Sequence, residues 1–223
     1  MNDYYSRKLA SNNLKRCYDL APTRVKQYLQ AEIDYVLQHI NSSDTVIELG
    51  CGYGRVMKQI QPYCAIRIGI DASLESLELA RDFTGHKSNC ILIQTRAECL
   101  PLRNDSVDKV VCIQNGISAF KVDPLTLVKE SIRITRKGGL CLFSSYSDDF
   151  WEERLDWFVL QSEEGLIGEI DWSKTSNGDI VCKDGFKAST FRAEDFVRLT
   201  DQLQLNAITC EIDESSVFCE IRV

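Results

Sequence analysis

One short stretch, Val46 to Val56 (V-I-E-L-G-C-G-Y-G-R-V), constrains the fold of this chain more than any other. An apolar run ends on Glu48, and glycines follow at alternate positions, Gly50, Gly52 and Gly54. This pattern predicts a buried strand, a tight turn and the start of a helix. Glycine accepts positive φ at little steric cost, and without a Cβ it lets a ligand lie directly on the backbone. The turn is therefore expected to hold a ligand.

The spacing of the glycines narrows the kind of ligand. A dinucleotide fingerprint, G-x-G-x-x-G, would need a third glycine where the chain has Arg55. A P-loop would end in Gly-Lys-Ser/Thr, and the turn has no such ending. A second apolar run, Ile66 to Ile70, ends on Asp71. An acid that closes the next strand is placed to accept hydrogen bonds from ribose hydroxyls.

Together these features resemble the class I S-adenosylmethionine-dependent methyltransferases, and the resemblance covers roughly Thr45 to Tyr146 well. It implies S-adenosyl-L-methionine as the cofactor, with its methionine part on the glycine turn and its ribose on Asp71. The cofactor-binding residues that it implies are Glu48, Gly50, Cys51, Gly52, Gly54, Asp71, Ala72, Arg96, Ala97, Glu98 and Gln114.

The segment Thr95-Arg-Ala-Glu-Cys-Leu-Pro-Leu resembles the part of the family that follows the third strand. The family usually has an acid there that accepts a hydrogen bond from the adenine amino group, and this chain has Arg96, which cannot accept one. The backbone of Ala97 or the carboxylate of Glu98 could contact the ring instead. Arg96 itself is expected either to stack on the base or to pair with an acid.

After the fourth predicted strand, the chain reads Gln114-Asn-Gly-Ile-Ser-Ala-Phe120. It has neither the N-P-P-Y motif of related enzymes nor an acid that could begin a magnesium site of the catechol-methylating kind. It resembles the Gly-Asn-Ser variant of small-molecule methyltransferases, including glycine-type N-methyltransferases. Gln114, Asn115 and Tyr18 are therefore candidates for positioning the acceptor, while no general base can be assigned. The alternative is that Asn115-Gly116 is simply a turn.

Strands and helices alternate through the middle of the chain, which predicts right-handed crossovers. The expected fold is α/β: a Rossmann-like, mostly parallel seven-stranded sheet with helices on both faces. Two closing strands, Ala207–Ile212 and Val217–Val223, are expected to form a terminal antiparallel hairpin. We expect a single domain over residues 1–223, with an N-terminal helical segment (1–42) and an insertion after the fifth strand (147–190).

The N-terminal segment contains an amphipathic helix over Thr23 to Ile40, preceded by a polar and aromatic stretch without strong periodicity. In the family, such a segment often folds over the cofactor as a lid, which would bring Tyr18 or Arg24 near it. The alternative, slightly favoured, is that the tyrosines of this segment, Tyr4, Tyr5 and Tyr18, only pack against the domain.

The insertion contains all three tryptophans, Trp151, Trp157 and Trp172. Helical spacing around Trp151 favours a packing role for these rings, and Gly165 to Gly185 is expected to form a β-hairpin about Asn177-Gly178. A less favoured hypothesis is that the insertion covers the substrate pocket and selects a cationic or amine substrate. It depends on ring faces and on four acids, Asp148, Asp149, Glu152 and Glu153.

Composition limits the remaining function classes. A net charge of −7 argues against nucleic-acid and anionic-membrane partners, which bind basic surfaces. The chain shows neither a long apolar segment nor a signal-peptide pattern, so a cytoplasmic location is expected. The ten cysteines form no C-x-x-C pair and are interpreted as small buried hydrophobes, and with only two histidines a metal site is not expected.

The leading function is therefore transfer of a methyl group to a small-molecule acceptor by in-line displacement. Two alternatives stay open: a cofactor-binding partner subunit without turnover, motivated by Arg96, and a methyltransferase that acts on RNA or protein. The sequence does not determine the acceptor atom or the oligomeric state.

Overall fold

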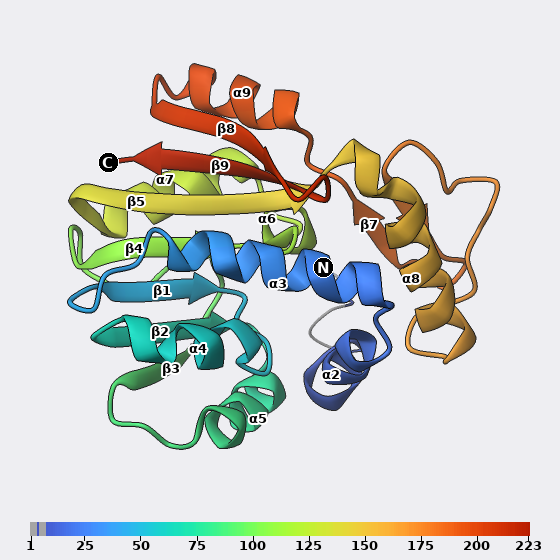
Figure 1. The fold of residues 1–223 in the computed structure, drawn as a ribbon, viewed down its shortest axis with the longest axis horizontal. Helices are drawn as coiled ribbons and strands as arrows, with labels where there is room; N and C mark the ends of the chain where they lie inside the picture. The colour runs from blue at the N-terminus through green and yellow to red at the C-terminus, as the bar shows by residue number, and fades with distance from the viewer. Residues whose placement is uncertain (1–3, 5–7) are drawn as a thin grey trace.

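The computed structural model describes residue 4 and residues 8–223 (Figure 1). Its main sheet has seven strands in the order β3-β2-β1-β4-β5-β9-β8. Strands β1 to β5 run parallel, and β9 runs antiparallel to both of its neighbours. Their bounds are Thr45–Leu49 (β1), Ile66–Asp71 (β2), Cys90–Gln94 (β3), Val107–Cys112 (β4), Thr135–Tyr146 (β5), Asn206–Ile212 (β8) and Ser216–Arg222 (β9). The predicted α/β fold and its terminal hairpin are confirmed.

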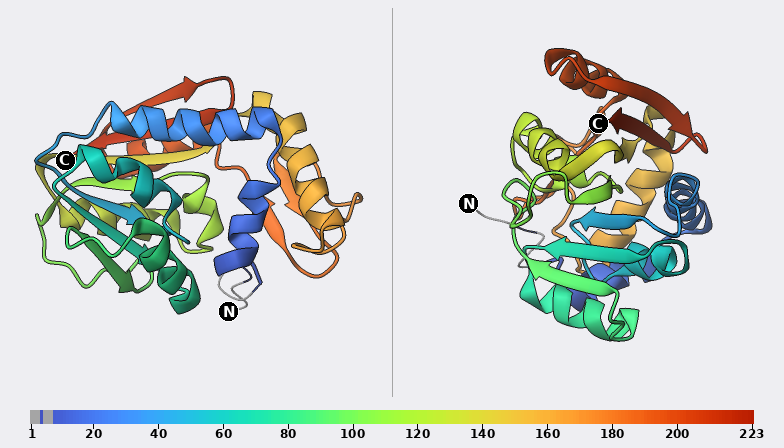
Figure 2. Two further views of the ribbon diagram at one scale, coloured as in Figure 1. Left: turned by 60° about the horizontal axis from the view of Figure 1, so that its bottom comes forward. Right: turned by 90° about the vertical axis from the view of Figure 1, so that its left-hand side faces the viewer.

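Helices cover both faces of this sheet (Figures 1 and 2). One core cluster joins α3, α4 and α5 to the sheet, and another joins α7 and α9 to its opposite face. Among the described residues, no helix is long and apolar enough to cross a bilayer. The bounds are Ser11–Asp19 (α2), Thr23–Leu37 (α3), Arg55–Ile60 (α4), Leu74–Thr84 (α5), Gly116–Ala119 (α6), Pro124–Ile134 (α7), Trp151–Glu163 (α8) and Ala193–Gln202 (α9), with 3-10 turns at Gln61–Tyr63 and Asp148–Phe150.

The parallel register brings the ends of three strands to one edge of the sheet. Glu48 on β1 aligns with Gly69 on β2 and with Val111 on β4. The carboxyl ends of these strands point toward α2 and α8 (Figure 1). Ligands bind at this edge in open parallel sheets, so the glycine turn and the loops after β2 and β4 lie where a site is expected.

Within the predicted N-terminal helical segment, Ser11–Asp19 forms a helix, α2, that the weak periodicity before Leu20 did not delimit. Leu14, Cys17 and Tyr18 are spaced three and four residues apart and provide its apolar side. This helix is too short for the pattern to stand out from the polar residues around it. Tyr5, one of the tyrosines considered above, lies outside the described residues.

The insertion reverses direction twice, and the turn that joins its two regular strands is not the predicted one. Strands β6 (Asp179–Val181) and β7 (Lys187–Ser189) pair antiparallel, so the chain reverses around Asp184 and Gly185. Asn177-Gly178 also forms a tight turn, bridged by Ser176 and Asp179, but it leads only to isolated pairing. Both dipeptides are good turn formers, and the tertiary packing of the insertion decides which one carries the regular strands.

The ten cysteines are all free thiols, and seven of them are buried. Their interpretation as small core hydrophobes is correct for those seven. Cys99 is the exposed exception.

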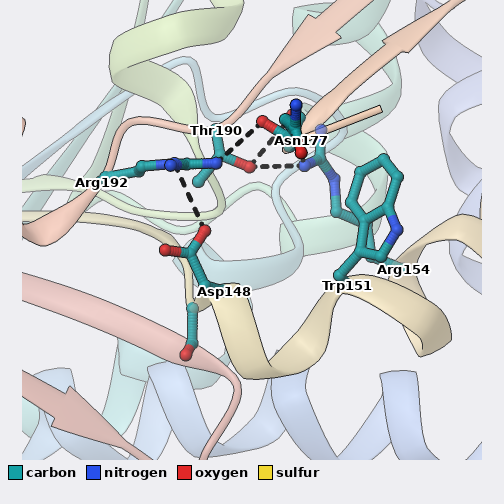
Figure 3. Close-up of a pocket in the computed structure, with 8 residues that line it drawn as sticks. Asp148, Trp151, Arg154, Asn177, Thr190 and Arg192 are labelled. Atoms are coloured by element: carbon teal, nitrogen blue, oxygen red, sulfur yellow. Dashed lines mark hydrogen bonds and ion pairs between the residues drawn. The ribbon is translucent and has the colours of Figure 1, made fainter. Parts of the chain in front are cut away.

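Arg154 on α8 links separate segments of the insertion to one another (Figure 3). Its side chain is fully buried, and its guanidinium donates hydrogen bonds to the carbonyls of Gly178 and Ala188, at 2.9 and 3.0 Å. The same group lies 4.2 Å from the centre of the Tyr146 ring, at the end of β5. A buried cation is stable only when such partners replace water, so this arginine orders both the hairpin and its junction with the sheet.

We predict that Arg154→Leu lowers the free energy of unfolding by about 3 kcal/mol, because several hydrogen bonds to a charged donor are lost at a buried position. Urea unfolding followed by tryptophan fluorescence measures this loss. The control is Arg198→Leu, at a side chain that is 66% exposed, and little change is expected there. Equal effects of the two substitutions would contradict the role given to Arg154.

Candidate functional site

The glycine turn after β1 has the backbone that its sequence predicts. Gly50, Gly52 and Gly54 have φ values of +74°, +52° and +85°, a region that L side chains rarely adopt. The N–H of Cys51 donates to the carbonyl of Ile70 at 2.8 Å, which fixes the turn against β2. The turn thus needs its glycines for their positive φ, as well as to let a ligand reach the backbone.

Asp71 connects the turn to the next helix. Its carboxylate accepts hydrogen bonds from the N–H of Gly52 at 2.9 Å and from the N–H of Ser73 at 2.8 Å. Ala72, which follows, lies at the tip of β2, and its carbonyl accepts from the side chain of Gln94. Asp71 therefore lies beside the glycine turn at the carboxyl end of β2, where a carboxylate can accept from ligand hydroxyls.

An acid and a base, Glu48 and Arg55, lie next to this turn, and each has buried atoms without a hydrogen bond in the described part of the chain. These atoms are Oε2 of Glu48 and Nε and Nη2 of Arg55. Burial raises the pKa of Glu48 to about 8, and Asp71 adds to that shift while Arg55 opposes it. Unpaired buried groups cost free energy, which is a reason to expect a polar ligand here.

Tyr18 and Gln114 meet on the other side of Arg55. The Tyr18 hydroxyl donates to Oε1 of Gln114 at 2.8 Å, and the Arg55 guanidinium lies 5.0 Å from the centre of the Tyr18 ring. Nε2 of Gln114 is buried without a hydrogen-bond partner among the described residues. A line of contacts thus runs from Arg55 through Tyr18 to Gln114, and the charge of Arg55 also acts on Glu48.

Helix α2 covers the glycine turn, as expected of a lid. Leu14 lies so close that its Cδ2 is 2.7 Å from where a Cβ on Gly52 would be, and the Phe120 ring lies 2.6 Å from that position on Gly50. A ligand that touches this backbone must displace these two side-chain ends. Arg24, the other lid residue considered, lies elsewhere and pairs with Asp213 at 2.6 Å.

The structure separates Gln114 from Asn115, which the sequence grouped together. Both have left-handed backbone, with φ of +58° and +61°. The Asn115 amide donates to the carbonyl of Ser189 at 2.9 Å and accepts from the Ser145 hydroxyl at 2.8 Å. Asn115 therefore joins the insertion to β5, while the side chain of Gln114 faces Tyr18.

The segment after β3 gives Arg96 one of its two expected roles, because its guanidinium pairs with the carboxylate of Glu98. Ala97 between them is buried in the core under the sheet. Arg96 thus pairs with an acid, and Glu98 is its partner in this structure.

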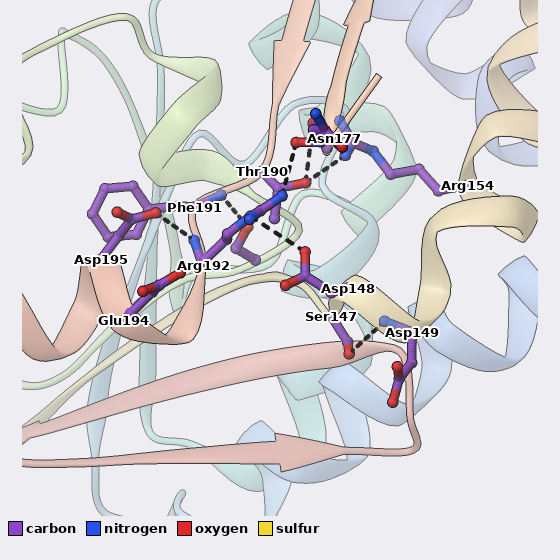
Figure 4. Close-up of polar contacts among 12 residues, drawn as sticks. Ser147, Asp148, Asp149, Arg154, Asn177, Thr190, Phe191, Arg192, Glu194 and Asp195 are labelled. Atoms are coloured by element: carbon purple, nitrogen blue, oxygen red, sulfur yellow. Dashed lines mark hydrogen bonds and ion pairs between the residues drawn. The ribbon is translucent and has the colours of Figure 1, made fainter. Parts of the chain in front are cut away.

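One acid and several rings of the insertion contact arginines within the protein (Figures 3 and 4). Asp148 pairs with Arg192 at 3.3 Å, and Arg154 lies over the rings of Trp151 and Phe158 as well as that of Tyr146. These contacts border a cavity of about 250 Å³ lined by Ser147, Asp148, Trp151, Arg154, Asn177, Gly178, Thr190 and Arg192. The packing role, which the sequence favoured for the three tryptophans, fits Trp151 and Trp157, whereas Trp172 is 64% exposed and does not pack in the core.

Two charged residues near the site were not predicted to contribute. Arg55 stands inside the glycine motif, where it was noted only as a departure from the dinucleotide pattern. Glu32 lies on α3, fully buried, and accepts a hydrogen bond from the N–H of Gln114 at 2.9 Å. Its signal in the sequence is an acid at helical spacing from the buried residues Leu29 and Val36.

The residues present fit the cofactor that the motif suggested. Buried Glu48 and half-buried Arg55 have carboxyl and guanidinium atoms without hydrogen-bond partners among the described residues, which suits the ammonium and carboxylate groups of an amino acid. Asp71 offers a carboxylate for hydroxyl groups. The three lie around one glycine turn.

Comparison with known proteins agrees with this geometry. Residues 47–143 match the model of the family described as methyltransferase domain. The chain is thus similar to methyltransferase domains over this stretch. It is 31% identical over 130 residues to a malonyl-[acyl-carrier protein] O-methyltransferase of Marinomonas sp. (strain MWYL1), an alignment that covers 56% of this chain and 47% of that protein. The chain thus spans about half the length of this curated relative.

Two solved structures share the fold of this chain over nearly its whole length. The PH0226 protein of Pyrococcus horikoshii OT3 has a TM-score of 0.71 at 16% identity, covering 100% of this chain and 99% of its own. The N-methyltransferase NodS of Bradyrhizobium japonicum WM9, in complex with S-adenosyl-L-homocysteine, has a TM-score of 0.60 at 17% identity, covering 100% and 98%. S-adenosylmethionine is the cofactor of this class.

The raised pKa of Glu48 predicts a pH dependence of stability. The folded chain binds this proton more tightly than the unfolded chain, so the contribution of Glu48 to stability falls as the pH rises from about 4.5 to about 8. Glu48→Gln should therefore be more stable than the wild type at pH 9, by about 2 kcal/mol, and nearly equal to it at pH 4.

Thermal unfolding of both proteins at the two pH values measures this difference. The exposed substitution Glu78→Gln serves as the control, and its effect should not depend on pH in the same way. A Glu48→Gln effect that is the same at pH 4 and pH 9 would refute the assignment.

Proposed function

We propose that the protein transfers a methyl group from S-adenosylmethionine to a small-molecule acceptor. The observation that carries this proposal is the set of buried atoms of Glu48, Arg55 and Gln114 that have no hydrogen-bond partner among the described residues. Contacts through Tyr18 join Arg55 to Gln114, and Glu48 is at the end of β1, before the glycine turn. The family match over residues 47–143 supports the same reaction.

Each residue of the site has a role in this proposal. Arg55 and Glu48 hold the amino-acid end of the cofactor, and Asp71 holds its ribose. When bound, S-adenosylmethionine supplies a methyl group already activated by the positive sulfur. The protein then has to align the acceptor with that methyl and exclude water, which Tyr18, Gln114 and the covering helix α2 can do.

The enclosure of the site supports a small acceptor. Helix α2 lies over the glycine turn, and the insertion is fastened to the loop after β4 through Asn115. The net charge of −7 opposes binding of RNA and of anionic membranes, and it suits a protein of the cytoplasm. The Marinomonas relative is named for a carrier-protein substrate and NodS for N-methylation, so relatives of this fold differ in acceptor.

A second candidate is a partner subunit that binds the cofactor without turnover. Arg96 favours it, because an arginine paired with Glu98 replaces the acid that usually contacts adenine. Incubating the purified chain alone with methyl-tritiated S-adenosylmethionine and pools of amine, thiol, hydroxyl and carboxylate compounds separates the two. Labelled product from any pool supports the enzyme, whereas binding without product from every pool supports the partner subunit.

We predict that Asp71→Ala weakens the binding of S-adenosylhomocysteine by about tenfold to a hundredfold, because hydrogen bonds to a carboxylate are lost. Isothermal titration calorimetry measures this affinity. Asp71→Asn should retain part of it, since the amide oxygen still accepts hydrogen bonds. The control is Asp82→Ala on α5, where the side chain is 76% exposed. Undiminished affinity in Asp71→Ala would refute the role of Asp71.

A further inference from the structure

Glu32 is a buried carboxylate at the meeting point of four segments. Its Oε2 accepts a hydrogen bond from the N–H of Gln114, at 2.9 Å. Its Oε1 accepts one from the Ser144 hydroxyl of β5, at 2.7 Å, and one from the Ser216 hydroxyl of β9. The side chain is fully buried on α3, and these partners are 82 or more residues away along the chain. Glu32 therefore joins α3, β5 and β9 to the loop that follows β4.

The backbone that Glu32 holds is unusual. Gln114 and Asn115 are two consecutive residues with positive φ, and neither is glycine. Such backbone costs free energy and persists only where the surroundings fix it. The N–H of Gln114 is fixed twice, by the Glu32 carboxylate and by the Ser144 hydroxyl, each at 2.9 Å. Gln114 is also the residue whose side chain meets Tyr18.

We propose that Glu32 is a positioning residue: its carboxylate holds the peptide of Gln114 in the left-handed conformation and so directs the Gln114 amide to Tyr18, at the acceptor side of the site. The fixation of Gln114 follows from the contacts alone, whereas its consequence for catalysis rests on the proposed function. Glu32 itself contacts neither cofactor nor acceptor in this scheme, because it lies behind the loop that it holds.

The environment of Glu32 makes its hydrogen bond to the N–H of Gln114 sensitive to pH. The titratable groups that face it are Tyr28 of α3, Cys112 of β4 and Tyr146 of β5, together with Arg55 of α4. Burial raises the pKa of Tyr28, Cys112 and Tyr146, so these three are neutral near pH 7.

Burial also raises the pKa of Glu32, to about 7, while the hydrogen bonds from Ser216, Ser144 and Gln114 and the charge of Arg55 oppose that shift. A carboxylate accepts the N–H of Gln114 more strongly than a protonated acid does. Gln114 is therefore held most firmly above pH 7 and less firmly below it.

Nuclear magnetic resonance on the full chain labelled with ¹⁵N-glutamine tests the hydrogen bond between Glu32 and Gln114 without any substrate. In the wild type, the backbone N–H resonance of Gln114, assigned with Gln114→Asn, should shift between pH 5 and pH 9 with a midpoint near 7. In Glu32→Gln the shift should vanish, because the amide keeps an acceptor oxygen but does not titrate. In Glu32→Leu, the N–H of Gln114 should exchange faster with solvent than in the wild type, because only the Ser144 hydroxyl still accepts from it.

The matched control is Asp34→Asn, an exposed acid on the same helix, which should behave as the wild type does. A Gln114 resonance that is indifferent to pH in the wild type, or one that titrates unchanged in Glu32→Gln, would overturn the proposal. Because Glu32→Gln retains the hydrogen bond to Gln114, this part of the test stands even if Glu32→Leu fails to fold.

The catalytic consequence is measured with any acceptor found by the tritium assay. Glu32→Leu should lower kcat by about tenfold to a hundredfold with little change in the KM for S-adenosylmethionine. Glu32→Gln should restore most of kcat and remove the loss of rate below pH 7. Equal kcat and pH profiles in all three proteins would show that Gln114 is held without effect on the reaction. If no acceptor is found, the proposed function fails while the resonance test of Glu32 remains valid.

Discussion

The parallel pairing of β1 with β2 on one side and with β4 on the other is the constraint on which this site depends. It brings the ends of the three strands to the same edge, so the glycine turn, Asp71 and Gln114 become neighbours although they are far apart in the sequence. The hydrogen bond from the N–H of Gly52 to Asp71 is the direct result of that alignment. A shift in register of either pair would separate the groups that the proposed cofactor has to bridge.

The same edge of the sheet holds several groups that destabilise the fold, and the packing of the rest of the domain has to offset them. Glu48 and Glu32 are buried carboxylates with raised pKa values, Arg55 has buried N–H groups without hydrogen bonds among the described residues, and Gln114 has a left-handed backbone. A bound ligand with an ammonium and a carboxylate would satisfy the polar atoms beside the glycine turn. These groups lower the stability of the ligand-free protein, and a ligand that pairs with them gains binding free energy in return. Strained and unpaired groups therefore often mark functional sites.

The fold could be predicted from the sequence because hydrophobic periodicity and the glycines and prolines that end helices and strands are local signals. Strand β1 has its expected limits, Thr45 and Leu49, since polar residues precede its apolar run and Gly50 follows it. The prediction failed where tertiary contacts decide: the regular hairpin of the insertion turns at Asp184-Gly185 and not at Asn177-Gly178. Of the site, the sequence predicted Glu48, the glycines and Asp71, but neither Arg55 nor Glu32. Glu32 was missed because its partners lie on distant segments and an acid in a helix ordinarily faces solvent.

A crystal structure of the protein with S-adenosylhomocysteine tests the central claim most directly. The account predicts the nucleoside on the glycine turn, with its ribose on Asp71, its carboxylate on Arg55 and its sulfur facing Gln114 and Tyr18. It also predicts that the side-chain ends of Leu14 and Phe120 have moved from their present contacts with Gly52 and Gly50. A nucleoside bound elsewhere, with Leu14 and Phe120 still against the glycines, would contradict it.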